Sequence, residues 1–231
     1  MSDIWNEKCI FSPSLICLDM CHLEDQITEL QKNGIKMLHI DILDGHFSPS
    51  MPLGFETVKQ LRAKTDIFFD CHVMTEKPDF FIDELISIGV QHISFHVETC
   101  SHVDGMLNKI KDAGILAGVA LKPSTSLSTV EYVIEKCDSI LLMLINPGYA
   151  SSKNETQISY LDEKIYDTWK LIQNKGLKTK IIIDGRISKE NIIKYGSDVV
   201  DIFVCGTTCI KRDDIELSTK SLFEIRKSLL M

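Results

Sequence analysis

The chain has 231 residues, 44% of them hydrophobic and 25% charged, which is typical of a globular protein with a sizeable core. The formal net charge of −8 argues against a nucleic-acid surface, because phosphate backbones select basic faces, but a small anionic substrate can be held by backbone N–H groups. The first residues form no apolar export signal, and no apolar run reaches the roughly 18 residues of a membrane span. We therefore expect a cytoplasmic protein with neither nucleic acid nor membrane as a partner.

Short apolar or β-branched runs recur along the chain and predict strands near residues 11–16, 36–42, 67–72, 91–97, 115–121, 138–145, 179–184 and 199–205. Between them, apolar residues at three- and four-residue intervals predict helices such as 23–33, 79–88, 103–112, 129–136 and 159–174. Gly34, Gly89, Gly114 and Gly176 follow these segments, where a left-handed helix end favours glycine.

Eight strand–helix units with short connections indicate parallel βαβ repeats. The number of units favours a (β/α)8 barrel spanning residues 1–231 as one domain, and an open doubly wound sheet is the alternative. The eight cysteines are scattered without a CxxC pair, so we expect reduced thiols, most of them packed in the core.

Polar residues interrupt two of the predicted strands in the same way. Alternation along a strand places His39 and Asp41 on one face, and Asp70 and His72 on one face of the next strand. In a barrel the apolar face points to the helices, so these polar side chains point inward, where charges must be paired or bound to metal.

A third strand, Ile181-Ile182-Ile183, ends in Asp184. We predict that His39, Asp41, His72 and Asp184 meet at one barrel mouth and hold one divalent ion, with Zn2+ as the first choice and Mn2+, Fe2+, Co2+ or Mg2+ as alternatives. Singly, such a histidine could be a hydrogen-bonded core residue and such an aspartate a helix cap. We assign Asp70 and His96 to support of this site.

Several blocks of sequence resemble the ribulose-phosphate 3-epimerase family, and they occur in the family's order from about Phe11 to Ile210. They are Ser12-Pro13-Ser14-Leu15, the run from His39 to Phe47, Asp70-Cys71-His72-Val73-Met74, Asn146-Pro147-Gly148 and Ile183-Asp184-Gly185.

The resemblance implies inversion of C3 in a ketose phosphate, with the metal stabilising an enediolate and with Asp41 and Asp184 as bases on opposite faces. Two carboxylates are needed, because a single base usually returns the proton to the face that it left. The resemblance also implies that Ser14, His72, Met74 and Met143 contact the substrate, that Gly148, Gly185, Gly206 and Thr207 lie near its phosphate, and that the chain forms a homo-oligomer.

The chain departs from the family's pattern around the phosphate. Residues 148–152 replace a glycine-rich stretch, Arg186 replaces a glycine, and Thr207 and Leu43 replace a serine and a methionine. Several of these departures resemble the allulose-6-phosphate 3-epimerase branch and favour a hexulose 6-phosphate, with D-ribulose 5-phosphate as the alternative. We predict that Arg186 adds a contact to the phosphate, the alternative being a solvated charge.

Two other classes of protein are less consistent with the sequence. A metal-free phosphosugar lyase or decarboxylase on a similar barrel would place a lysine beside the aspartates, and no lysine accompanies His39-Ile40-Asp41 or Asp70-Cys71-His72. A non-catalytic phosphosugar-binding barrel would not need both Asp41 and Asp184.

Overall fold

The computed structural model describes residues 3–150 and 152–231, and over this part of the chain it has eight strands. They are β1 (Ile10–Pro13), β2 (Met37–Leu43), β3 (Phe68–Met74), β4 (His92–His96), β5 (Leu116–Leu121), β6 (Ser139–Met143), β7 (Lys180–Asp184) and β8 (Ile202–Cys205). Each coincides with one of the predicted runs, so the strand predictions are confirmed.

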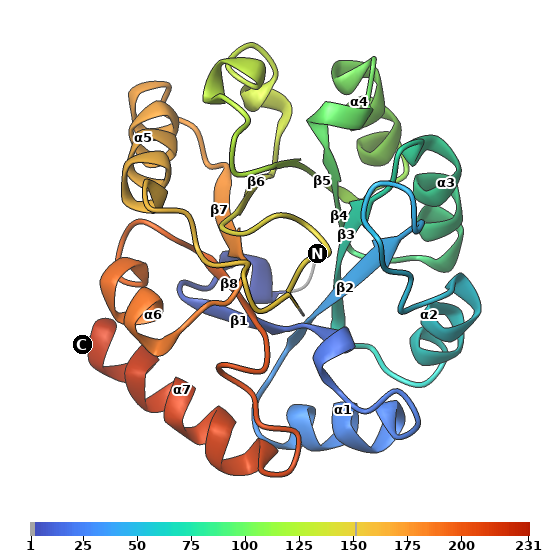
Figure 1. The fold of residues 1–231 in the computed structure, drawn as a ribbon, viewed down its shortest axis with the longest axis vertical. Helices are drawn as coiled ribbons and strands as arrows, with labels where there is room; N and C mark the ends of the chain where they lie inside the picture. The colour runs from blue at the N-terminus through green and yellow to red at the C-terminus, as the bar shows by residue number, and fades with distance from the viewer. Residues whose placement is uncertain (1–2, 151) are drawn as a thin grey trace.

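The strands are parallel and form one sheet in the order β1-β8-β7-β6-β5-β4-β3-β2. An isolated parallel bridge between Ser14 and His39 joins the two edges, so that the sheet curves into a nearly closed barrel (Figure 1). The predicted (β/α)8 barrel is confirmed, and the open doubly wound alternative is excluded. Between β2 and β3 the register places His39 beside Asp70 and Asp41 beside His72.

Helices surround the barrel on the outside (Figure 1). They are α1 (Leu23–Lys32), α2 (Phe55–Arg62), α3 (Pro78–Ile88), α4 (Val103–Asp112), α5 (Leu161–Asn174), α6 (Lys189–Tyr195) and α7 (Ile215–Leu229). Gly34, Gly89, Gly114 and Gly176 follow their helices with positive φ, as predicted.

The helix predicted over 129–136 is wrong. The structure has two short 3-10 helices there, η4 (Leu127–Thr129) and η5 (Ile134–Lys136). Val130 and Ile134 are both buried, so the apolar spacing indicated the buried face correctly. The segment is rich in β-branched residues, which are weak helix formers, and the Ser126 side chain accepts the Ser128 N–H, which favours a turn.

The alternation predicted for β2 and β3 places apolar side chains outside and polar ones inside. Leu38, Ile40 and Ile42 belong to the large hydrophobic cluster between strands and helices, as do Phe69, Cys71 and Val73. The inward faces of the same strands carry His39, Asp41, Asp70 and His72, which are almost fully buried, and also apolar residues such as Met37 and Phe68. The candidate functional residues therefore lie inside the barrel. The layer between the strands and the helices supplies most of the apolar packing.

The amino-terminal end of the barrel is covered by the chain itself. The 3-10 helix η1 (Asp3–Asn6) places Trp5 on Phe68 and on His92, with ring centroids 5.8 and 5.0 Å apart. Polar side chains near the axis are thus shielded at this end. A search of the described residues for a helix long and apolar enough to cross a membrane found none.

Candidate metal and catalytic site

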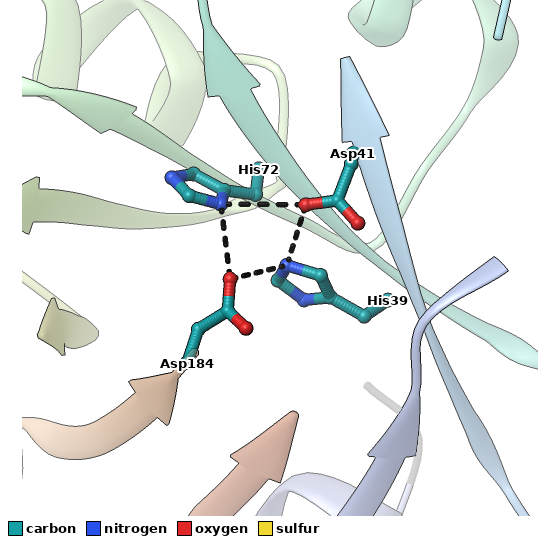
Figure 2. A group of neighbouring side chains, drawn as sticks. All are labelled: His39, Asp41, His72 and Asp184. Atoms are coloured by element: carbon teal, nitrogen blue, oxygen red, sulfur yellow. Dashed lines mark ion pairs between the residues drawn. The ribbon is translucent and has the colours of Figure 1, made fainter. Parts of the chain in front are cut away.

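Four predicted side chains converge at the carboxyl-terminal end of the barrel (Figure 2). His39 and Asp41 come from β2, His72 from β3, and Asp184 from the last position of β7. One nitrogen or oxygen from each lies within 4.8 Å of the other three. The strands thus bring together in space residues that are far apart along the chain.

The donor atoms alternate between nitrogen and oxygen around the group. His39 Nε2 lies 3.3 Å from Asp41 Oδ1 and 4.0 Å from Asp184 Oδ2. His72 Nδ1 lies 3.6 Å from the same Asp41 oxygen and 3.8 Å from the same Asp184 oxygen. Ligand atoms about 2.0–2.2 Å from a tetrahedral ion lie roughly 3.3–3.6 Å from one another, so these separations suit a small divalent ion.

A hydrogen bond to Asp70 fixes the orientation of the His39 ring. The Nδ1–H of His39 donates to Asp70 Oδ2 at 2.8 Å, and His92 Nδ1 donates to Asp70 Oδ1 at 2.7 Å. His39 therefore presents Nε2 to the group. Burial opposes a charge on His39, but Asp41 and Asp70 outweigh this effect and raise its pKa well above the usual value.

The two imidazole nitrogens at the centre are buried and make no hydrogen bond with any described residue. His39 Nε2 and His72 Nδ1 face the same small space, and each is a lone-pair donor when its ring is protonated on the other nitrogen (Figure 2). A buried polar atom without a partner is costly, and a bound ion would satisfy both nitrogens at once. The group therefore fits a divalent metal ion.

The two carboxylates have opposite electrostatic surroundings. Burial alone would raise the pKa of Asp41, yet His39 and His72 hold it far below its ordinary value. Asp41 Oδ2 also accepts the Ser14 hydroxyl at 2.8 Å. Burial raises the pKa of Asp184 to about 7, and the charge of Asp41 adds to this against the opposing effect of His39.

The structure also places the three other side chains predicted to contact substrate. Ser14 immediately follows β1 and bonds Asp41, whereas Met74 and Met143 end β3 and β6 and are buried. Met143 is the register partner of Asp184, and Met74 is the partner of Leu43. All three positions lie at the end of the barrel that carries the candidate metal-binding group.

The predicted phosphate residues lie in the loops that follow β6, β7 and β8. Gly148 has φ +81° and packs so closely on Ser48 that a Cβ would lie 2.2 Å from its hydroxyl oxygen. Gly185 has φ +114°, and a Cβ there would lie 2.9 Å from the backbone nitrogen of Ile145. Gly206 and Thr207 directly follow β8. The loop after β6 thus packs closely on Ser48 at Gly148 and on Gly185 of the loop after β7 at Ile145, as glycine permits.

Arg186 makes contacts that the sequence did not indicate. Its side chain is exposed, and its Nη2 donates to the carbonyls of Ala150 at 3.0 Å and Ser152 at 2.7 Å. Arg186 therefore joins the loop after β7 to the loop after β6; Ser151, between those two carbonyls, lies outside the described residues. A contact with phosphate stays a prediction.

The sequence analysis missed two residues that support the site, His92, which is buried, and Glu98. His92 bonds Asp70 and also lies 2.7 Å from Ser139 Oγ, and Glu98 Oε2 lies 2.9 Å from His96 Nδ1. A signal for His92 existed, since it shares a strand face with His96 by alternation. For Glu98 the His-x-Glu spacing resembles that of His39 and Asp41, but this residue lies beyond the strand, where alternation no longer applies.

Comparison with known proteins is consistent with this geometry. The model of the "Ribulose-phosphate 3 epimerase family" matches residues 10–210. The ribulose-phosphate 3-epimerase of Bacillus subtilis is 33% identical over 221 residues, covering 94% of this chain and 98% of that protein. The ribulose-phosphate 3-epimerase of Aquifex aeolicus is 32% identical and covers 96% of this chain and 97% of that protein. The chloroplastic enzyme of Arabidopsis thaliana is 32% identical and covers 92% of this chain and 75% of that protein.

Solved structures show the same fold at low identity. A 3-keto-L-gulonate-6-phosphate decarboxylase from Vibrio cholerae aligns with a TM-score of 0.69 and 10% identity, covering 97% of this chain and all of that chain. A thiamine phosphate pyrophosphorylase from Pyrococcus furiosus aligns with a TM-score of 0.64 and 14% identity, covering 99% of this chain and all of that chain. These two likenesses concern the fold alone. The match over residues 10–210 and the relatives above 30% identity show that the chain belongs to the ribulose-phosphate 3-epimerase family and is an isomerase of the carbohydrate-phosphate epimerase class.

Proposed function

We propose that the chain inverts C3 of a ketose phosphate by two-base proton transfer at a site that depends on a divalent metal ion. The observation that carries this proposal is the group of His39, Asp41, His72 and Asp184, in which two carboxylates and two unpartnered imidazole nitrogens lie within 4.8 Å. Family membership supports the same activity.

In this proposal His39 Nε2, His72 Nδ1 and one oxygen of each aspartate hold the ion. Zn2+ is the proposed metal, because two imidazoles and two carboxylates in a compact group suit a borderline transition ion better than Mg2+. When bound, the ion supplies Lewis-acid stabilisation of the negative charge that develops on the substrate oxygens next to C3.

The chain's own residues move the proton. Asp41 and Asp184 come from strands on different sides of the barrel mouth, and a ketose between them would present opposite faces of C3 to the two carboxylates (Figure 2). One carboxylate removes the C3 proton, and the other delivers a proton to the opposite face. Met74 and Met143 supply apolar walls that exclude water from the reacting carbon.

D-ribulose 5-phosphate, which would be converted to D-xylulose 5-phosphate, is the first proposed substrate. Relatives named ribulose-phosphate 3-epimerase or, in Arabidopsis thaliana, ribulose-5-phosphate-3-epimerase are 30 to 33% identical over most of the chain. A specific observation favours a second candidate, D-allulose 6-phosphate, which would be converted to D-fructose 6-phosphate. Around the phosphate loops the chain has Gly148-Tyr149-Ala150, Arg186 and Gly206-Thr207 in place of the family's glycine-rich pattern.

The decisive experiment is a comparison of kcat/KM on the two ketose phosphates with metal-replete and metal-depleted enzyme. We expect chelation to abolish turnover on both sugars and re-addition of Zn2+ to restore it. A His72→Ala variant should lose metal content in parallel. Full activity of metal-free protein would contradict the metal dependence, and a C3 proton that does not exchange with deuterated solvent would contradict the proton transfer.

A further inference from the structure

A row of side chains in mutual contact leads away from the candidate metal-binding group on the side of His72. His72 Nε2 lies 3.0 Å from His96 Nε2, and His96 Nδ1 lies 2.9 Å from Glu98 Oε2. His72 and His96 are fully buried, and their ring centroids are 5.1 Å apart. The chain thus runs from Glu98, in the 3-10 helix η3 (Val97–Thr99) after β4, to the one nitrogen of His72 that faces away from the site.

Glu98 is fixed as a hydrogen-bond acceptor. Its Oε1 accepts the backbone N–H of Lys122 at 2.7 Å and the hydroxyl of Thr125. Burial opposes its charge, but the contacts with His96 and Thr125 lower the pKa of Glu98 to about 2. An ionised carboxylate has no proton to donate, so the proton shared with His96 must be carried by His96 Nδ1.

The order of protons along the chain follows from this fixed end. The fully buried His96 has one carboxylate contact, at Nδ1, and a neutral imidazole that donates from Nδ1 accepts at Nε2. Two ring nitrogens 3.0 Å apart need one donor and one acceptor, which places the proton between them on His72 Nε2. A neutral His72 protonated at Nε2 presents the lone pair of Nδ1 to Asp41 and Asp184.

We propose that Glu98 and His96 are positioning residues that set the tautomer of His72, so that Nδ1 is a ready ligand for a divalent ion. This inference rests on the metal site of the proposed function. The ring of Phe47, which follows β2, lies with its centroid 4.7 Å from that of His96 and restricts rotation of the imidazole. Glu98 thus orients His72 indirectly, through the imidazole of His96.

The variant Glu98→Gln tests the order of protons directly. The backbone N–H of Lys122 can only donate, so the glutamine carbonyl takes that position and the amide NH2 faces His96. His96 Nδ1 then accepts, His96 Nε2–H donates to His72 Nε2, and the proton of His72 moves to Nδ1, toward the metal position. We expect Zn2+ affinity, measured by competition with a chromophoric chelator, to fall by about 10–100-fold.

Ring 15N chemical shifts of the metal-free protein provide the second readout. In the wild type we expect the His72 proton on Nε2, and in Glu98→Gln we expect it on Nδ1, a change that a merely structural role would not produce. His96→Phe keeps a buried ring but removes the acceptor, and it should also weaken Zn2+ binding by about 10–100-fold. Glu131→Gln, which removes an equal charge from an exposed position, is the matched control.

Wild-type Zn2+ affinity in both Glu98→Gln and His96→Phe, or a His72 proton found on Nδ1 in the wild type, would overturn the proposal. Failure of the proposed function is read separately, since turnover of metal-free wild type would refute metal-dependent epimerisation. The tautomer of His72 is measured without metal or substrate and decides the role of Glu98 and His96 independently of turnover.

Discussion

The two sides of the candidate site are built in different ways. On the β2–β3 side, Asp41 is held by the Ser14 hydroxyl and flanked by His39 and His72, and its side chain is 5% exposed. On the β7 side, Asp184 is 17% exposed and ends its strand, directly before two residues with positive φ, Gly185 and Arg186.

This difference explains how two carboxyl groups of the same chemical kind can have different proton affinities, as an acid and a base on one carbon require. Fixed donors and neighbouring imidazoles keep Asp41 ionised, whereas partial burial and the charge of Asp41 raise the pKa of Asp184 to about 7. An acid and a base on opposite faces of one carbon require environments that separate their proton affinities. On the β2–β3 side Asp41 is thus held ionised in a fixed position. On the β7 side Asp184 exchanges a proton more readily near neutral pH.

The largest effect should follow from Asp184→Asn, which keeps an oxygen for the metal but removes the titrating group. We expect net epimerisation to fall by about 10²–10⁴-fold, the usual contribution of a positioned acid or base. Exchange of the C3 proton with deuterated solvent should persist for one epimer only, and Asp41→Asn should leave exchange for the other. A metal-loaded Asp184→Asn enzyme with a near-normal rate would contradict separate roles for Asp41 and Asp184.

Metal binding should weaken as the pH falls from 8 to 6. The pKa values of Asp184 and His39 are raised, so both groups hold protons that the metal must displace, whereas Asp41, whose pKa is lowered, holds none in this range. Each displaced proton lowers the apparent affinity by about tenfold per pH unit. Calorimetry in two buffers of different ionisation enthalpy measures the protons released, and zero release at pH 6 would contradict the prediction.

A smaller effect should follow from Ser14→Ala, which removes the fixed donor to Asp41. Its loss should raise the pKa of Asp41 and lower kcat by about tenfold, since hydrogen bonds to charged groups contribute about 1.5–3 kcal/mol. Ser94→Ala is the matched control, because Ser94 is also buried but donates to the backbone carbonyl of Cys71. A rise in KM at constant kcat would instead assign Ser14 to substrate binding alone.

The smallest effect should come from Arg186→Ala on the β7 side. The exposed arginine loses two hydrogen bonds to the loop after β6, each worth about 0.5 kcal/mol at an exposed position, so KM for the phosphorylated ketose should rise roughly fivefold. Residual activity on the unphosphorylated ketose should change little if the loop orders the phosphate. Equal changes in KM for both sugars would show that Arg186 does not act on binding of the phosphate.

Strand alternation predicted the inward polar residues of β2 and β3, and the unpredictable folding of the loops limited the rest. The inward positions of His39, Asp41 and His72 depend only on period-two geometry, so the sequence sufficed to bring them to one side of the sheet. The partners of Arg186 could not be predicted, because they depend on how the loops after β6 and β7 fold against each other. Glu98 was missed for the same reason, since it acts from a 3-10 turn beyond β4.

Asp70 has a consequence for how the sequence can vary. One carboxylate accepts from imidazoles on two different strands, His39 on β2 and His92 on β4, and His92 in turn contacts Ser139 on β6. Replacement of any member leaves a buried donor or acceptor without a partner, at a cost of about 1–3 kcal/mol or more for a charged group. Positions 39, 70, 92 and 139 therefore constrain one another, and viable substitutions among them should occur together rather than one at a time.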